Sequence, residues 1–437
     1  MPIESVTVKT PAAKVKSQQR NNRGQGNGVA AGRSKAETSP IEIASMEFAR
    51  KVNRDAVLKL IRLMQPIARV DLARASGLQN STVSSLVEQL LAEGWIREGE
   101  VLRTARGRRP TQISLNDRLS MLVADVHPGR AQFGVVDLNG QVLSCSEFTM
   151  PLDVEEGVQK LGFAMQQMRA IYADRQFEGA GVCIPGRVDL ESGRLMVAPN
   201  LRWRDFDIRE ALAKVLGMPV EMENDANACL LSELWFGRLD GVRNAVLLAI
   251  SEGVGASLLA EGRLVSGRNG MAGEFGHVCV DPDGPSCNCG RRGCWEVFAS
   301  SRAALQHYKK LVPSDRRSLG YEELCRLATG GHSAAREAIE RQGMAIGRGL
   351  RMVTAALEPE VILFVGEIAY GWPIVAPIIE RECRASLLAG ELPRFVCAGD
   401  TNKAHILGAA AVVLQRHSGY YRSEAANWRT TVPQRSL

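Results

Sequence analysis

The sequence predicts an α/β protein with a small helical domain at its front, and three observations support this fold class. Strand-like and helix-like segments alternate over residues 121–415, a pattern typical of sheets covered by helices. Residues 55–94 carry three short helix patterns, and two short strand patterns follow them. The 437 residues, 45% hydrophobic and 23% charged, are enough for two or three globular domains.

Charge is distributed unevenly along the chain. Residues 1–110 contain 19 Lys and Arg against 10 Asp and Glu, a balance of +9, whereas the other residues contain 35 basic and 38 acidic ones, a balance of −3. A basic front on a mildly acidic body indicates that one part meets a polyanion, although a solvated basic tail would give the same balance. Residues 1–45 lack an apolar period and are expected to form a disordered basic tail, and residues 418–437 a flexible one.

Residues 46–116 have the pattern of three helices and a basic hairpin. The first helix carries apolar residues at helical spacing and ends before Pro66: Val57, Leu60, Ile61 and Met64. A second helix near residues 69–76 ends at Gly77, and Asn80 or Ser81 caps a third one. The third helix buries one stripe: Val83, Leu86, Val87, Leu90 and Leu91. Strands at 95–98 and 112–115 flank a basic segment, which completes the pattern of a winged helix-turn-helix domain.

The third helix and the basic segment carry the residue types of a DNA-binding surface. Small polar side chains open the helix and would let it approach the floor of the major groove: Gln79, Asn80, Ser81, Thr82, Ser84 and Ser85. Arg106, Arg108 and Arg109 form a thin cationic wing that suits a minor groove or the phosphate backbone. The sequence therefore predicts DNA binding, and a three-helix interaction module with a solvated loop is the alternative.

Four potential metal ligands lie within 18 residues: His277, Cys287, Cys289 and Cys294. Three thiolates and one imidazole complete a tetrahedral zinc site and leave no open position, so we predict one structural zinc per chain. Glu274 and Glu296 flank this segment, and the metal would hold the loop that aims them. Chance grouping is the alternative, but the chain has only 10 Cys and 6 His.

The other cysteines are scattered through apolar segments and are expected to be reduced core residues, not a disulfide framework. The sequence shows no apolar span of membrane length, and residues 1–33 lack the apolar stretch of a signal peptide. We therefore expect a cytoplasmic protein with no membrane partner.

The metal-ligand segment also carries a family resemblance. Gly-Glu-Phe-Gly-His at 273–277, followed by Cys-Asn-Cys-Gly-Arg-Arg-Gly-Cys-Trp-Glu at 287–296, resembles the signature of the ROK family of sugar kinases and sugar-responsive repressors. Further segments agree in order, at 184–189, 198–201, 223–228 and 357–362. The resemblance implies an actin/hexokinase-like body of two lobes around a cleft, over residues 117–417. Family members with a winged helix ahead of this body are transcription factors, such as repressors of xylose or N-acetylglucosamine genes.

The resemblance also implies an effector site. The residue that matches Asp225 is the general base in the family's kinases, where it takes the proton of a sugar hydroxyl. The family's sugar contacts match five further residues: Asn200, Asn224, Glu274, His277 and Glu296. Carboxylates and amides suit vicinal hydroxyls because each can bind two groups at once. The sugar side of the cleft is therefore expected to be intact.

The nucleotide side departs from the family's kinases. Their Asp-x-Gly-Gly-Thr phosphate loop is Asp-Val-His-Pro-Gly at 125–129, and Pro128 removes a backbone N–H that would face phosphate. Glu252 and Glu367 add negative charge to two further nucleotide loops, and only Arg130 could offset part of it. Two like charges about 4 Å apart cost about 1 kcal/mol in water and about 4 kcal/mol at an effective dielectric of 20. We therefore expect weak ATP binding.

These observations predict a DNA-binding transcriptional regulator that is controlled by a sugar or sugar phosphate. We expect it to be a repressor. A winged helix recognises few base pairs alone, so we expect a homodimer or homotetramer. No catalytic activity is expected. One alternative is a ROK sugar kinase that carries a DNA-binding head, which the presence of Asp225 favours. Another is a sensor whose effector is a protein.

Overall fold

The computed structural model of the chain describes residues 46–101, 111–189, 192–198, 200–237, 239, 241–267, 270–385, 390–398 and 401–416. The predicted tails at 1–45 and 418–437 lie outside these residues. Arg106, Arg108 and Arg109 of the predicted wing lie outside them as well. Among the described residues, no helix combines the length and the apolarity that crossing a membrane requires.

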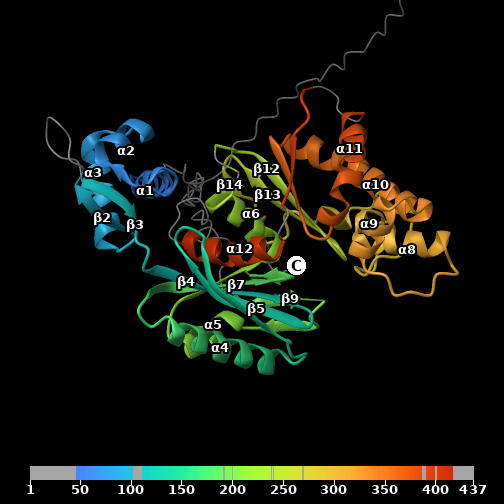
Figure 1. Ribbon diagram of the computed structural model, residues 1–437, viewed down its shortest axis with the longest axis horizontal. Coiled ribbons are helices and arrows are strands. Elements are labelled where there is room, and N and C mark those ends of the chain that lie inside the picture. The colour runs from blue at the N-terminus through green and yellow to red at the C-terminus, as the bar shows by residue number, and fades with distance from the viewer. Residues whose placement is uncertain are drawn as a thin grey trace, which may run out of the picture. The chain divides into compact units, whose positions relative to one another are not determined.

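The predicted winged helix-turn-helix elements are present at the front of the described chain (Figure 1). The helices are α1 (Met46–Met64), α2 (Arg69–Ser76) and α3 (Asn80–Ala92). β1 (Ile67–Ala68), β2 (Ile96–Val101) and β3 (Thr111–Leu115) form an antiparallel sheet in the order β1-β3-β2. The apolar face predicted for the third helix is buried at Val83, Leu86, Val87 and Leu90. This packing of three helices on a small sheet confirms the predicted fold of the head.

Two details of the head differ from the prediction. The helix α3 begins at Asn80, so Gln79 occupies the N-cap position, and its side chain accepts no capping hydrogen bond. The predicted cap at Asn80 or Ser81 is therefore wrong. Met64, expected on the buried face of the first helix, is 49% exposed, because α1 ends there before the chain turns at Gln65 and Pro66.

The first lobe of the body is built on a five-stranded sheet in the order β11-β7-β4-β5-β6. Its strands are β4 (Leu119–His127), β5 (Arg130–Asp137), β6 (Val142–Phe148), β7 (Gln176–Ile184) and β11 (Val220–Asn224). The predicted strand pair that turns at residues 127–129 is confirmed by β4 and β5, which are antiparallel neighbours. A small sheet of β8 (Arg187–Val188), β9 (Leu195–Ala198) and β10 (Trp203–Phe206) follows β7.

Alternate residues of the central strand β4 face two helical layers. Leu122, Ala124 and Val126 pack in one core with α4 (Val154–Ile171) and α5 (Ile208–Leu216). Met121 and Val123 point to the opposite face and pack with α12 (Thr401–Gln415). Figure 1 shows α4 and α5 on one side of this sheet and α12 on the other. Since side chains alternate along a strand, Asp125 lies on the α12 face.

The second lobe is built on a sheet in the order β14-β13-β12-β15-β16. Its strands are β12 (Ala245–Ile250), β13 (Val254–Ala260), β14 (Arg263–Leu264), β15 (Val361–Val365) and β16 (Arg394–Cys397). One face packs against α6 (Asp225–Trp235), and the other against a helical group: α8 (Ser301–Leu311), α9 (Tyr321–Thr329), α10 (Ser333–Leu357) and α11 (Ile368–Arg384). The predicted helix at 333–354 is thus α10, which runs three residues further.

The helix α12 is the return connection between the lobes. It follows β16 of the second lobe, covers the first sheet at β4 and β7, and packs along α6. Gly181 on β7 is needed for this approach, because a Cβ there would overlap the carbonyl oxygen of Ala409. The two helices α6 and α12 therefore lie between the two sheets, as the implied actin/hexokinase-like fold requires.

The cysteines are all free among the described residues, as the sequence predicts. Cys183, Cys229, Cys325 and Cys383 are buried. The prediction of core positions is wrong for Cys145, which is exposed on the edge strand β6, and for Cys279, which is exposed, and Cys397 is only half-buried.

Candidate functional site

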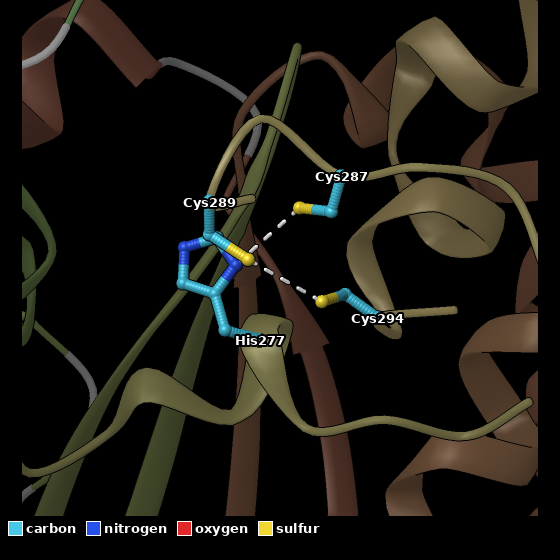
Figure 2. A group of neighbouring side chains, drawn as sticks. All are labelled: His277, Cys287, Cys289 and Cys294. Carbon is cyan, nitrogen blue, oxygen red and sulfur yellow. Dashed lines mark hydrogen bonds between the residues drawn. The ribbon is translucent and has the colours of Figure 1, made fainter. Parts of the chain in front are cut away.

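The four predicted metal ligands come together in one loop between β14 and α8 (Figure 2), and we call them the loop cluster: His277, Cys287, Cys289 and Cys294. Their ligand atoms all lie within 4.8 Å of one another. His277 Nδ1 lies 3.7 Å from Cys287 Sγ, and Cys289 Sγ lies 3.6 Å from Cys294 Sγ. Ligands about 2.0–2.3 Å from a tetrahedral zinc ion stand about 3.3–3.8 Å apart. The loop cluster therefore has the donor set and the spacing that fit a metal ion.

Short turns hold this loop in place. His277 ends a 3-10 helix, η1 (Glu274–His277), and Cys294 lies just before α7 (Glu296–Ala299). The backbone N–H of Val280 donates to Gly293 O at 2.8 Å, and that of Cys287 to Arg291 O at 2.8 Å. Gly293 has φ +64°, and a Cβ there would overlap the carbonyl oxygen of Asp281. The turn before Cys294 thus requires a glycine at position 293.

Burial raises the pKa of the Cys287 thiol and raises that of Cys294 to about 12. The exposed Cys289 differs, because a backbone N–H of Arg291 donates to its sulfur and lowers its pKa. Zinc binds thiolates, so a bound divalent cation would have to displace the protons of the two buried thiols.

The two glutamates beside the loop cluster are held differently. Glu296 is buried, and its carboxylate accepts hydrogen bonds from the Val254 N–H at 3.2 Å and from Arg302 Nη2 at 3.2 Å. The Glu274 side chain is 56% exposed, and its Oε2 lies 3.9 Å from His277 Nε2. His277 thus offers Nδ1 to the thiols and Nε2 toward Glu274, an arrangement compatible with the predicted orientation of Glu274 by the metal loop.

Asn224 and Asp225 lie at the junction between β11 and α6. Asn224 is the N-cap of α6, since its Oδ1 accepts from the backbone N–H groups of Ala226 and Asn227. Its Nδ2 donates to Gly186 O at 2.9 Å. These bonds leave Asn224 one N–H for a ligand. Asp225 is half-buried in the first turn of the helix.

Elements that carry several of the predicted effector residues contact the strand β13. The helix α6, which begins at Asp225, packs on β13, and so does η1, which carries Glu274 and His277. Glu296 binds the first residue of that strand, Val254. Asn200 is exposed, two residues after β9. The convergence of all six residues on one ligand remains a prediction.

A cavity of about 1040 Å³ lies elsewhere in the second lobe and shares none of the six predicted effector residues. It is bounded by the loop after η1 and by the helices α8 and α10, and Trp295 and Phe298 line it. Its position behind the loop cluster does not bear on the predicted sugar contacts.

Two of the three predicted nucleotide-side loops meet in the second lobe. The Glu367 N–H donates to Ser251 Oγ at 3.1 Å, so these two loops are in contact. Burial raises the pKa of Glu367, and the charge of Glu252 raises it further. Arg130, which the sequence offers as a compensating charge, has its Nη1 3.7 Å from Glu147 Oε2.

Sequence reasoning missed a cluster at the end of β4, which we call the sheet cluster: Asp125, His127 and His405. Asp125 Oδ2 lies 3.0 Å from His127 Nε2 and 3.3 Å from His405 Nδ1. Burial alone would raise the pKa of Asp125, but the two imidazoles hold it well below its usual range. His127 and His405 are 278 residues apart, so no local spacing could have indicated the group.

Glu223 is a second residue that sequence reasoning missed. It is fully buried, and burial raises its pKa to about 7 despite hydrogen bonds from the Asn227 side chain and the Asn224 N–H. Asp125, Cys183 and Glu223 are register neighbours across β4, β7 and β11. The α12 face of the first sheet therefore carries two buried carboxylates in one row.

Comparison with known proteins decides the family. A sequence profile of the ROK family matches residues 125–416. The chain belongs to the ROK family. This ROK protein is 28% identical over 390 residues to the xylose repressor of Bacillus subtilis strain 168, a match that covers 86% of this chain and 98% of that protein. It is 29% identical to the DNA-binding transcriptional dual regulator NagC of Escherichia coli K12, over 78% of this chain and 86% of NagC.

Solved ROK structures agree with the fold. A ROK family transcriptional regulator, described as a homolog of the E. coli MLC protein, superposes with a TM-score of 0.74 at 27% identity, over 85% of this chain and 98% of that one. A ROK family glucokinase from Streptomyces griseus, solved with glucose and AMPPNP, gives a TM-score of 0.61 at 27% identity. That match covers 99% of the glucokinase but only 68% of this chain.

Proposed function

We propose that this ROK protein is a transcriptional repressor that responds to a sugar or sugar phosphate. One observation carries the proposal: the xylose repressor and the ROK regulator match 85–86% of the chain, whereas the glucokinase matches 68%. We assign the additional matched length to the winged helix-turn-helix elements, which a sugar kinase does not need. A regulator of this kind works on chromosomal DNA in the cytoplasm.

Residues 46–116 form the DNA-binding domain in this proposal. Four of the six predicted contact residues on α3 are exposed, as a recognition helix requires: Gln79, Asn80, Ser81 and Ser85. Thr82 and Ser84 are half-buried and can reach phosphates at the helix start. The wing with Arg106, Arg108 and Arg109 would contact the adjacent groove. A homodimer or homotetramer would place two heads on two half-sites.

Residues 117–417 form the sugar-sensing body. Asn200, Asn224, Asp225, Glu274, His277 and Glu296 are the proposed effector contacts. Asn200 and Asn224 belong to the first lobe, whereas Glu274, His277 and Glu296 belong to the second, so a sugar bound by both sets would draw the lobes together. Closure favours one arrangement of the heads, and a ligand that binds the closed form better shifts the population toward it.

The loop cluster is proposed to hold one structural zinc per chain. Its four donors match the preference of zinc for thiolate and imidazole ligands, and a four-ligand set leaves no place for a substrate. The metal would fix the loop from which Glu274 and Glu296 reach the effector.

We propose no kinase activity for this chain. Glu252 and Glu367 influence each other electrostatically, and both would lie against a nucleotide polyphosphate. Arg130 faces Glu147. Asp225 is the observation that favours the alternative, a ROK sugar kinase with a DNA-binding head, because a half-buried carboxylate at a helix start can act as a general base.

Two measurements on the full chain separate these functions. Fluorescence anisotropy with operator DNA from the neighbouring genes should show binding that falls when one member of a panel of free and phosphorylated sugars is added. A coupled ADP-release assay with the same panel and ATP should show no turnover. Sugar-dependent ADP release that Asp225→Asn abolishes would establish the kinase. If no sugar of the panel changed the anisotropy of the DNA complex, the effector would be a protein.

A further inference from the structure

The sheet cluster has the composition and spacing of a second metal site. We propose that Asp125, His127 and His405 bind a divalent transition-metal ion that fastens α12 to the end of β4. The inference does not rest on the proposed function, because it uses only the geometry of these three side chains.

The distances fit an ion shared by three ligands. The three atoms Asp125 Oδ2, His127 Nε2 and His405 Nδ1 stand 3.0, 3.3 and 3.3 Å apart. The point equidistant from them lies about 1.9 Å from each, close to the Zn–N and Zn–O bond lengths of about 2.0–2.2 Å. An ion slightly out of that plane would have three bonds of normal length and tetrahedral angles.

The environment of Asp125 requires a positive partner. The residue is 1% exposed, and neither carboxylate oxygen accepts a hydrogen bond of acceptable geometry among the described residues, although two ring nitrogens lie close. A buried carboxylate without compensation is strongly unfavourable. A metal ion supplies the charge and uses the nitrogen lone pairs, and a proton on His405 is the competing source of charge.

The surroundings also support ligation. His405 is buried, and the Cys229 thiol, which is hydrogen-bonded to its ring, orients it. Metal-binding histidines generally have such orienting partners. The His127 side chain is 25% exposed, so the fourth position of the ion would open toward solvent and accept water or a ligand atom.

The donor set restricts the metal. Two imidazoles and one carboxylate suit zinc, iron, cobalt or nickel, whereas magnesium prefers oxygen ligands in an octahedral shell. One ligand lies on the helix that arrives from the second lobe, and two lie on the central strand of the first. The ion would thus tie the interlobe connection to the segment 125–129.

Metal content of the full-length protein tests this proposal. The protein is stripped with a chelator, reloaded with zinc, desalted and measured by inductively coupled plasma mass spectrometry. We expect two zinc ions per wild-type chain and one in His127→Ala. The control is His307→Ala, which removes a histidine of similar exposure, 22%, from α8 and should retain two.

Cobalt reloading identifies which ion is lost. Thiolate-to-cobalt charge-transfer absorption reports only the loop cluster, so it should be unchanged in His127→Ala while one equivalent of cobalt disappears. His405→Gln should lose the same equivalent, and circular dichroism checks that each variant folds. A single ion per wild-type chain that His127→Ala retains would overturn the proposal and assign the charge near Asp125 to a proton. Two ions in a folded His127→Ala would overturn it as well.

Discussion

The loop cluster and the sheet cluster are assembled in opposite ways. The four ligands of the loop cluster lie within 18 residues and are held by short turns. The ligands of the sheet cluster come from β4 and α12, which are buried against each other across the first lobe. A metal ion should therefore determine the structure of the first, whereas packing already determines that of the second. Metal binding would thus fold the loop in the loop cluster. In the sheet cluster it would stabilise the contact between β4 and α12 that packing already forms.

The largest effect is expected from the loop cluster. Cys289→Ser removes an exposed ligand without disturbing core packing, so its effect reports the metal. We expect loss of the loop-bound zinc and a decrease of about 3 kcal/mol in the free energy of unfolding. Thermal and urea unfolding with parallel metal analysis measure it.

Cys279→Ser is the matched control, because Cys279 is exposed in the same loop and does not belong to the cluster. It should keep both the metal and the stability. Equal stability of the two variants would mean that the turns, not the metal, hold the loop.

A second prediction uses the other buried carboxylate in the row of the sheet cluster. The pKa of Glu223 is raised to about 7 in the folded chain, above the ordinary value of 4.5, so the folded state holds this proton more tightly than the unfolded state. The contribution of Glu223 to the free energy of unfolding is fully present below pH 4.5. It decreases by about 3 kcal/mol as the pH rises to 7.

Urea unfolding between pH 4.5 and 8 measures this loss. Glu223→Gln should flatten the pH dependence by that amount, and Glu221→Gln on the same strand should leave it in place. If the free energy of unfolding of the wild type did not decrease across this pH range, Glu223 would ionise in the folded state with little loss of stability. The sheet would then tolerate unpaired charge, and the need of Asp125 for a cation would be weaker.

A third prediction concerns Glu296, one of the two glutamates that the loop cluster is proposed to orient. Glu296→Gln keeps the shape of the side chain but removes the charge that binds Arg302 and the proposed effector. Loss of charged hydrogen bonds of this kind costs about 1.5–3 kcal/mol, which is about 10- to 100-fold in affinity. Isothermal titration with the sugar found in the panel measures it. Glu340→Gln on α10 is the control, and an unchanged affinity in Glu296→Gln would remove this residue from the effector site.

The smallest effects are expected in the head, which contains neither cluster. Asn80→Ala should weaken operator binding by about 1–3 kcal/mol and leave binding to scrambled DNA unchanged. Arg108→Ala should weaken both similarly and reduce the slope of log affinity against log salt by about 1. Anisotropy titrations at several salt concentrations distinguish the two. A loss of specificity in Arg108→Ala, or none in Asn80→Ala, would reverse their assigned roles.

The sequence predicted what depends on neighbouring residues. Helical spacing identified the buried face of α3, and the close ligands identified the loop cluster. The role of Asn224 as the cap of α6 was not evident, because the chain gives no sign of where β11 ends. The sheet cluster could not be found, since His405 approaches Asp125 only after the chain has formed the second lobe and returned through α12. Contacts of that kind depend on the tertiary packing of whole layers.

The close contact at Gly181 has a mechanical consequence. The helix α12 lies against β7 with no room for a single methyl group at that point, and a Cβ at Gly408 on the same helix would lie 2.7 Å from the backbone of Ala228 in α6. With these two contacts, α12 cannot slide along β7 or α6 without a collision of backbones. The helix can still rotate about its own axis. We expect the two lobes to rotate relative to each other about the long axis of α12.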